Sequence, residues 1–160
     1  MSKSRRVTWD EHAEPAKNAH QYLPKLVSDY FARARDLLAH DPDPSRLHSL
    51  RLATKRLRYS LELFRPCYGA GLATRIARLR KLQQVLGEIN DAAAAQRALA
   101  EMLKGASPQR ARIKKFFQER GEAKAREFRK HWTEEFDAPG QELWWTSYLT
   151  RHSRKPSRKP

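Results

Sequence analysis

The sequence predicts an all-α protein, an antiparallel helical bundle of four main helices plus a short C-terminal helix. Three observations lead to this prediction. Apolar residues recur at intervals of three and four along most of the chain, prolines and glycines separate these periodic segments, and no segment alternates apolar and polar residues as a strand would. The chain has 160 residues, enough for one domain that buries its own core.

The first helix is predicted over about 16–39, where the apolar residues form a single stripe. Pro24 lies inside this pattern, so the helix either kinks there or begins near Tyr22. The segment 41–45 holds two prolines and predicts a short connector, whose second proline opens a second helix that runs to about Phe64. The inward positions predicted in the first helix are Leu23, Leu26, Val27, Tyr30, Phe31, Ala34, Leu37 and Leu38.

Two long helices and a short one complete the bundle. The third helix is predicted over about 72–103, ending at Gly105, with Leu79, Leu82, Leu86 and Ile89 directed inward. Ser107 and Pro108 form the cap and first turn of a fourth helix. Its predicted inward residues are Ile113, Phe117, Phe128, Trp132 and Phe136, and after a break at Pro139-Gly140 the segment 143–149 forms a short aromatic lid.

The positive charge is concentrated in two parts of the chain. The whole chain carries 33 Lys and Arg against 18 Asp and Glu, a net charge of +15. Residues 46–81 hold ten bases and the single acid Glu62, and residues 151–160 hold five bases and no acid. This excess predicts a polyanionic partner. We expect three parts of the chain: a flexible segment 1–15, a helical domain 16–150 and a disordered basic tail 151–160.

The sequence also predicts the cellular location of the protein. No apolar run approaches the roughly 20 residues of a membrane helix, and the N-terminal residues lack the apolar stretch of a signal peptide. Cys67 is the single cysteine, so an intramolecular disulfide is excluded and a reducing compartment is favoured. We therefore expect a soluble cytoplasmic protein with no membrane association.

The second helix has the most informative pattern. His48, Arg51, Lys55 and Arg58 fall on one face over about three turns. Apolar groups flank this face on both sides: Leu50, Leu57, Leu61 and Phe64 form a core stripe, and Leu52, Tyr59 and Leu63 form a second group. A solvated face would contain more acids, so the pattern favours a recessed basic groove that binds anions over plain surface.

Two segments carry a resemblance to a known family. Residues 47–64, LHSLRLATKRLRYSLELF, resemble the histidine-arginine helix of the CHAD family, the conserved histidine alpha-helical domains. Residues 79–91, LRKLQQVLGEIND, resemble the second hallmark of that family. The two hallmarks occur in the family's order, and the resemblance covers about 16–103.

The resemblance implies that the chain binds inorganic polyphosphate through basic side chains. The ligand positions it implies are His48, Arg51, Lys55, Arg56 and Arg58 from the first motif, with Arg78 and Lys81 as a looser match in the next helix. Gly87 is interpreted as allowing close helix contact, and Asp91 as holding a basic side chain across the groove.

The family resemblance also bears on assembly. Full-length family members look like two related helical halves with the motifs in each, whereas this chain has one copy and resembles the second half. We expect a homodimer that uses Leu52, Tyr59 and Leu63 as its interface. In the alternative, a monomer covers these residues with its fourth helix and the Trp144-Trp145 lid.

Two other functions compete with polyphosphate binding. A sequence-independent nucleic-acid binder would use the same basic face together with the C-terminal arm. An enzyme acting on phosphate compounds is disfavoured, because the sequence has no Gly-rich phosphate loop, no paired-carboxylate motif and no closely spaced metal ligands. We therefore expect a non-catalytic protein without cofactor or metal, associated with polyphosphate granules; storage, sensing and recruitment remain open as its role.

Overall fold

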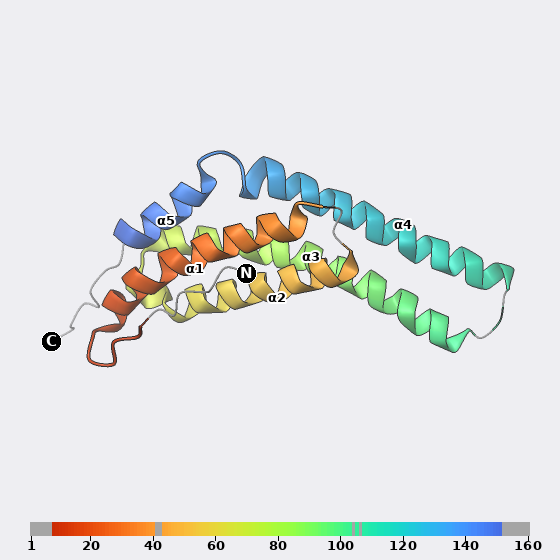
Figure 1. Cartoon of the computed structure of the whole chain (residues 1–160), viewed down its shortest axis with the longest axis horizontal. Helices are drawn as coiled ribbons and strands as arrows, with labels where there is room; N and C mark the ends of the chain where they lie inside the picture. Colours follow the sequence, from red (N-terminus) through yellow and green to blue (C-terminus); the bar gives the residue numbers. More distant parts are fainter. Residues whose placement is uncertain (1–7, 41–42, 104, 106, 152–160) are drawn as a thin grey trace.

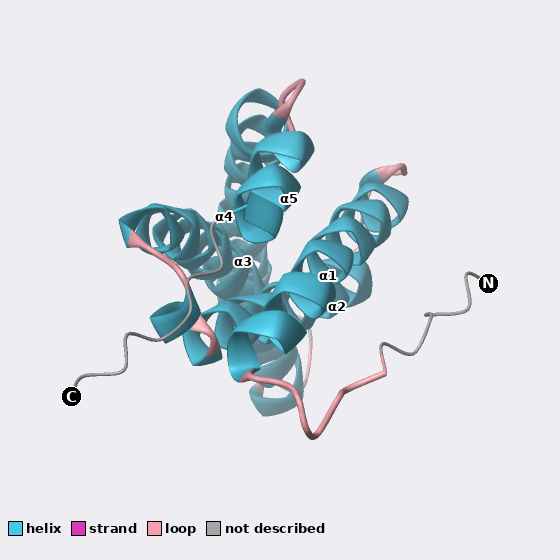
Figure 2. Cartoon of the chain, turned by 90° about the vertical axis from the view of Figure 1, so that its left-hand side faces the viewer, coloured by secondary structure: helices cyan, strands magenta, loops and turns pink. Residues whose placement is uncertain are grey.

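The computed structural model describes residues 8–40, 43–103, 105 and 107–151, and these residues form helices joined by short loops (Figures 1 and 2). The elements follow in the order α1 (Pro15–Leu38), α2 (Pro44–Leu63), the 3₁₀ turn η1 (Arg65–Cys67), α3 (Ala70–Met102), α4 (Pro108–His131), the π-helical turn η2 (Trp132–Phe136) and α5 (Gln141–Arg151). The all-α prediction is confirmed.

Local sequence signals fix the helix ends. Asp43 caps α2 by accepting a hydrogen bond from the backbone nitrogen of Arg46 (2.8 Å), and Ser107 caps α4 in the same way through Arg110 (3.1 Å). A proline follows each of these caps in the first helical position. In α1 the helix begins at Pro15, so Pro24 lies inside it and the predicted later start near Tyr22 is wrong.

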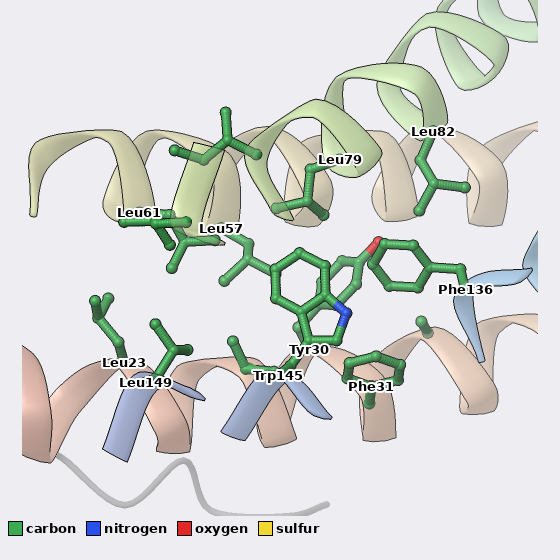
Figure 3. Packing of buried hydrophobic residues seen from close by; sticks show 14 of the residues in the cluster. Leu23, Tyr30, Phe31, Leu57, Leu61, Leu79, Leu82, Phe136, Trp145 and Leu149 are labelled. Carbon is green, nitrogen blue, oxygen red and sulfur yellow. The ribbon is translucent and has the colours of Figure 1, made fainter. Parts of the chain in front are cut away.

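The core lies where α1, α2, α3 and α5 meet. Figure 3 shows Leu23 and Phe31 of α1, Leu57 of α2, Leu79 of α3 and Trp145 of α5 converging on it. All five side chains are almost completely buried. The η2 turn contributes Phe136, whose ring stacks on that of Phe31 with the centroids 5.4 Å apart. The short aromatic segment predicted near the C-terminus therefore forms α5 and is part of the core.

The fourth helix differs from the prediction in two ways. The α-helical hydrogen bonding ends at His131, and Trp132–Phe136 continue as a π-helical turn. Ile113, predicted to point inward, is 36% exposed. The reason is visible in Figure 1, where α4 and the later part of α3 extend beyond α1 and α2 as a two-helix hairpin, so the first turns of α4 pack against one helix instead of a bundle.

Buried polar contacts join α2 and α5 to the rest of the bundle. Thr54 of α2 donates to the carbonyl of Leu50 (2.8 Å), and its hydroxyl lies 2.8 Å from that of Tyr30 on α1. At the other side of the core, Arg75 of α3 is 4% exposed and donates to the carbonyl of Trp144 (2.7 Å). Burial lowers the pKa of Arg75 to about 10, so the guanidinium stays charged at neutral pH.

Gly71 is required by close packing near the start of α3. A Cβ atom at this position would lie 2.7 Å from Cε2 of the Tyr148 ring. The same ring lies 3.9 Å from Cζ of Arg75, and its hydroxyl donates to the carbonyl of Gly69 (3.0 Å). A side chain at Gly71 would therefore displace the Tyr148 ring and disturb its contacts with Arg75 and Gly69.

The predicted domain limits fall partly outside the described residues. Residues 1–7 of the predicted flexible segment and 152–160 of the predicted basic tail are not described, and Arg151 is the last residue of α5. Within the described part, the backbone nitrogen of Asp10 donates to Asn18 of α1 (3.2 Å), and the Trp9 ring lies 5.8 Å from that of Phe64. The short stretch before α1 thus contacts both α1 and the end of α2. No helix in the described ranges is both long and apolar enough to cross a bilayer.

The Tyr30–Thr54 contact gives the first testable prediction. Thr54→Val keeps the shape but leaves the buried Tyr30 hydroxyl without its partner, which costs about 1–3 kcal/mol. Tyr30→Phe leaves Thr54 bonded to Leu50, so its cost is smaller, about 1 kcal/mol. Urea denaturation of both variants measures the difference. Equal stability of the two variants would show that this contact does not anchor α2.

Candidate functional site

The basic stripe, which we define as His48, Arg51, Lys55 and Arg58, runs along α2. Its direction follows from the neighbouring face of the helix, where Leu50, Leu57 and Leu61 are at most 1% exposed. Burial of these leucines fixes the rotation of α2 about its axis, so the four basic residues lie together beside the core stripe. The structure therefore brings together four of the seven predicted ligand residues.

At the start of the stripe, His48 and Arg51 lie against α3. His48 Nδ1 lies 2.9 Å from Oδ1 of Asn90, and because a carbonyl oxygen only accepts, Nδ1 carries the proton. Arg51 is half-buried, and its Nε has no hydrogen-bond partner among the described residues. Gly87 of α3 lies beside it: a Cβ there would be 4.0 Å from the Arg51 Nε, an ordinary contact. Gly87 thus borders the stripe, but close helix packing does not require it.

Tyr59 packs against the next two cations. Its ring centroid lies 5.5 Å from the Lys55 Nζ and 4.4 Å from the Arg58 Cζ. An aromatic ring attracts both cations and reduces the cost of placing them one turn apart. Tyr59 therefore acts at the stripe itself, whereas the sequence pattern suggested only an apolar interface residue.

The far end of the stripe is a network centred on Glu62. Its Oε1 accepts hydrogen bonds from Arg58 Nη1 (2.6 Å) and from Arg80 Nη2 of α3 (2.9 Å). Arg58 Nε also donates to Oε1 of Gln83 (2.8 Å). Partial burial alone would raise the pKa of Glu62, but the hydrogen bonds and charges of Arg80 and Arg58 outweigh it and hold this pKa below its ordinary value.

Two neighbouring clefts open at this network. One of about 300 Å³ is lined by Arg58, Arg80, Gln83 and Gln84. The other, of about 510 Å³, is lined by Glu62, Arg65, Pro66, Tyr68, Gly69, Ala70 and Ala73. Both are open to solvent, so an extended anion has access to this end of the stripe.

The three other predicted ligand residues lie elsewhere. Arg56 is exposed and lies about 100° around α2 from Lys55. Arg78 donates to Oε1 of Gln141 on α5 (2.8 Å), with its Cζ 4.6 Å from the Trp144 ring. Lys81 lies 3.7 Å from Glu135 of η2. The structure does not bring these three side chains to the basic stripe.

Arg80, Gln83 and Asn90 are the α3 residues that meet the stripe, and the sequence analysis missed them. Together with Gly87 they are spaced by three, four and three residues, which places them on one face of a helix. That spacing was present in the second motif and could have identified the face. Asp91, expected to hold a basic side chain, is exposed and has no ion-pair partner among the described residues.

The second apolar group of α2 is uncovered. Leu52 is 50%, Tyr59 49% and Leu63 74% exposed, so neither α4 nor α5 covers these side chains as the monomer alternative required. That expectation is wrong because α4 packs on α3 and α5 packs on α1. No group of three or more histidine, cysteine or acidic residues within the described ranges is arranged to hold a metal ion.

Comparison with known proteins gives one result. The family model described as CHAD domain matches residues 3–100, more than half of the chain. No curated protein and no solved structure shows a significant match. The matched segment contains all of α1 and α2 and most of α3, which are the helices that build the stripe and its α3 border.

Proposed function

Because the chain belongs to the CHAD family, we propose that it binds inorganic polyphosphate, without catalysis and without a cofactor, along the basic stripe and Arg80. The observation that carries this proposal is the line of cations on successive turns of α2, bordered by polar residues of α3. Among the described residues, Arg51 and Lys55 have no acidic partner, so their charges are available to a ligand, and the neighbouring His48 also has no acidic partner.

The chemistry of polyphosphate suits this arrangement. The polymer carries about one negative charge per phosphate, so cations at intervals of one helical turn, about 5.4 Å, can each meet a phosphate farther along the same flexible polymer. Guanidinium groups bind phosphate oxygens through two parallel hydrogen bonds, while an ammonium acts as a point charge. Arg51, whose Nε has no partner among the described residues, and Lys55 would bind phosphates at the middle of the stripe. His48 would contact the polymer at the start of α2.

Arg56, Arg78 and Lys81 have a different place in this proposal. Arg78 and Lys81 are engaged with α5 and η2, and Arg56 lies on another face of α2. We propose that they raise the positive potential around the stripe and attract the polyanion at longer range, without direct contact. We further propose a cytoplasmic location in association with polyphosphate granules, which the single buried cysteine, Cys67, suits.

Nucleic acid is the alternative ligand, and one observation favours it. The Tyr59 ring is half-exposed among cations, as in proteins that stack single-stranded bases on aromatic rings. Of the basic arm assigned to this function, residues 151–160, Arg151 is the last residue of α5 and residues 152–160 lie outside the described residues. Polyphosphate remains the preferred ligand because Tyr59 already packs against Lys55 and Arg58.

Competition distinguishes these ligands. At one near-physiological salt concentration, we expect long-chain polyphosphate to displace single-stranded and duplex nucleic acid, because no group of the stripe needs a base. We also expect it to bind far more tightly than orthophosphate, since only a chain contacts the whole stripe at once. Fluorescence anisotropy measures both comparisons. Stronger binding of nucleic acid would favour the alternative, and equal affinity for orthophosphate would refute the extended groove.

A double substitution tests the stripe directly. Arg51→Ala with Arg58→Ala removes two charged contacts worth about 1.5–3 kcal/mol each, so polyphosphate affinity should fall at least tenfold. The matched control is Arg112→Ala with Arg126→Ala, which removes the same charge from exposed positions on α4. Melting curves confirm that both variants fold. Equal losses in the two variants would indicate that only net charge matters.

The exposed apolar group of α2 bears on how the protein assembles. We propose that two chains associate across the exposed apolar group of α2, chiefly Leu52 and Leu63, and that polyphosphate tightens the dimer by neutralising two adjacent stripes. Analytical ultracentrifugation with and without polyphosphate should show a dimer that strengthens with ligand. A single chain at tens of micromolar protein, unchanged by ligand, would contradict the proposal.

A further inference from the structure

Glu62 is the single acid in the basic region of residues 46–81, and it lies at one end of the stripe. One carboxylate oxygen, Oε1, accepts hydrogen bonds from Arg58 of α2 (2.6 Å) and Arg80 of α3 (2.9 Å). The Glu62 side chain is 27% exposed and that of Arg58 is 15% exposed, so this pair is partly shielded from solvent, whereas the Arg80 side chain is 63% exposed. Shielding strengthens the attraction relative to a fully exposed ion pair.

The carboxylate of Glu62 uses the same arginine groups that a phosphate would use. Carboxylates and phosphates bind guanidinium with similar geometry, so the two anions compete for one pair of donors. A phosphate that approached Arg58 and Arg80 without moving Glu62 would also meet its negative charge. We propose that Glu62 is an internal competing anion, which occupies the arginine pair in the free protein and limits how tightly the stripe binds polyphosphate.

The rest of the stripe offers the route by which a chain overcomes this competition. His48, Arg51 and Lys55 have no acidic partner in the described part of the chain, so a polyphosphate can bind them first. Its next phosphates then lie close to Arg58 and Arg80 at high local concentration. Glu62 also borders the 510 Å³ cleft, which is lined in part by the exposed Arg65. A Glu62 carboxylate displaced from Arg58 and Arg80 has room in this cleft and can pair there with Arg65.

Glu62→Gln tests this inference, which rests on the proposed function. The substitution keeps the shape and removes the charge, so Arg58 and Arg80 no longer exchange one anion for another, and we expect polyphosphate to bind at least about fivefold more tightly. The free variant should melt at a lower temperature, since it loses both ion pairs. A side chain with a merely structural role would lower stability without raising affinity.

Glu119→Gln is the matched control. Glu119 lies on α4, away from the stripe, and pairs with Lys115 at 3.7 Å, so its substitution makes the same charge change and also removes an ion pair. We expect less than a twofold effect on affinity. Glu62→Ala should tighten binding in the same direction as Glu62→Gln, which separates loss of charge from any contact made by the glutamine.

The results separate the two proposals. If the unmodified protein binds polyphosphate and Glu62→Gln binds it equally or more weakly, the role of Glu62 is overturned. The proposed polyphosphate binding is then unaffected. An equal gain in Glu119→Gln also overturns it, because general electrostatics then explains the effect. Absence of polyphosphate binding in the unmodified protein and in both Glu62 variants overturns the role of Glu62 together with the proposed function.

Discussion

Burial of one leucine face fixes the rotational setting of α2, and the whole site depends on that constraint. Leu50, Leu57 and Leu61 are almost fully buried, and turning them outward would expose three large apolar side chains at about 1.5–3 kcal/mol each. Thr54 adds a buried hydroxyl contact to Tyr30 on the same side. The basic stripe consequently lies along the border with α3, and its direction needs no interaction among the cations themselves.

Cations held this close repel one another, and the fold limits the repulsion in two ways. Tyr59 places one ring against both Lys55 and Arg58, and Glu62 places one carboxylate between Arg58 and Arg80. The ring is neutral and leaves the cations free to bind an anion, whereas the carboxylate occupies them. The two ends of the stripe therefore differ: the end at His48 has no acidic partner among the described residues, and the end at Arg58 is already neutralised in part.

Other arginines, inside and outside the basic region, stabilise the fold. Arg75 is buried against Trp144 and Tyr148, Arg78 bonds to Gln141, and Arg35 of α1 donates to Asp137 (3.0 Å) and Glu142 (2.7 Å). Each joins α5 or the loop before it to the remaining helices. Net charge therefore overstates the ligand surface, because a guanidinium that stacks on tryptophan and bonds a backbone carbonyl is not available to phosphate.

The sequence alone determined the helices, the Ser107 cap of α4 and the stripe on α2. These features depend on spacing within one segment, such as Ser107 before Pro108 or the four basic residues of the stripe along a single helix. Only the tertiary structure decided which face of α3 meets that stripe. Arg78 and Lys81 lie only about 60° apart around α3, whereas Arg80 lies about 100° from Lys81 and about 160° from Arg78. The packing of α3 against its neighbours directs Arg80 to Glu62, while Arg78 and Lys81 face α5 and η2. A contact between two helices depends on the position and rotation of each helix. A sequence pattern within one segment specifies only which residues share a face of that helix.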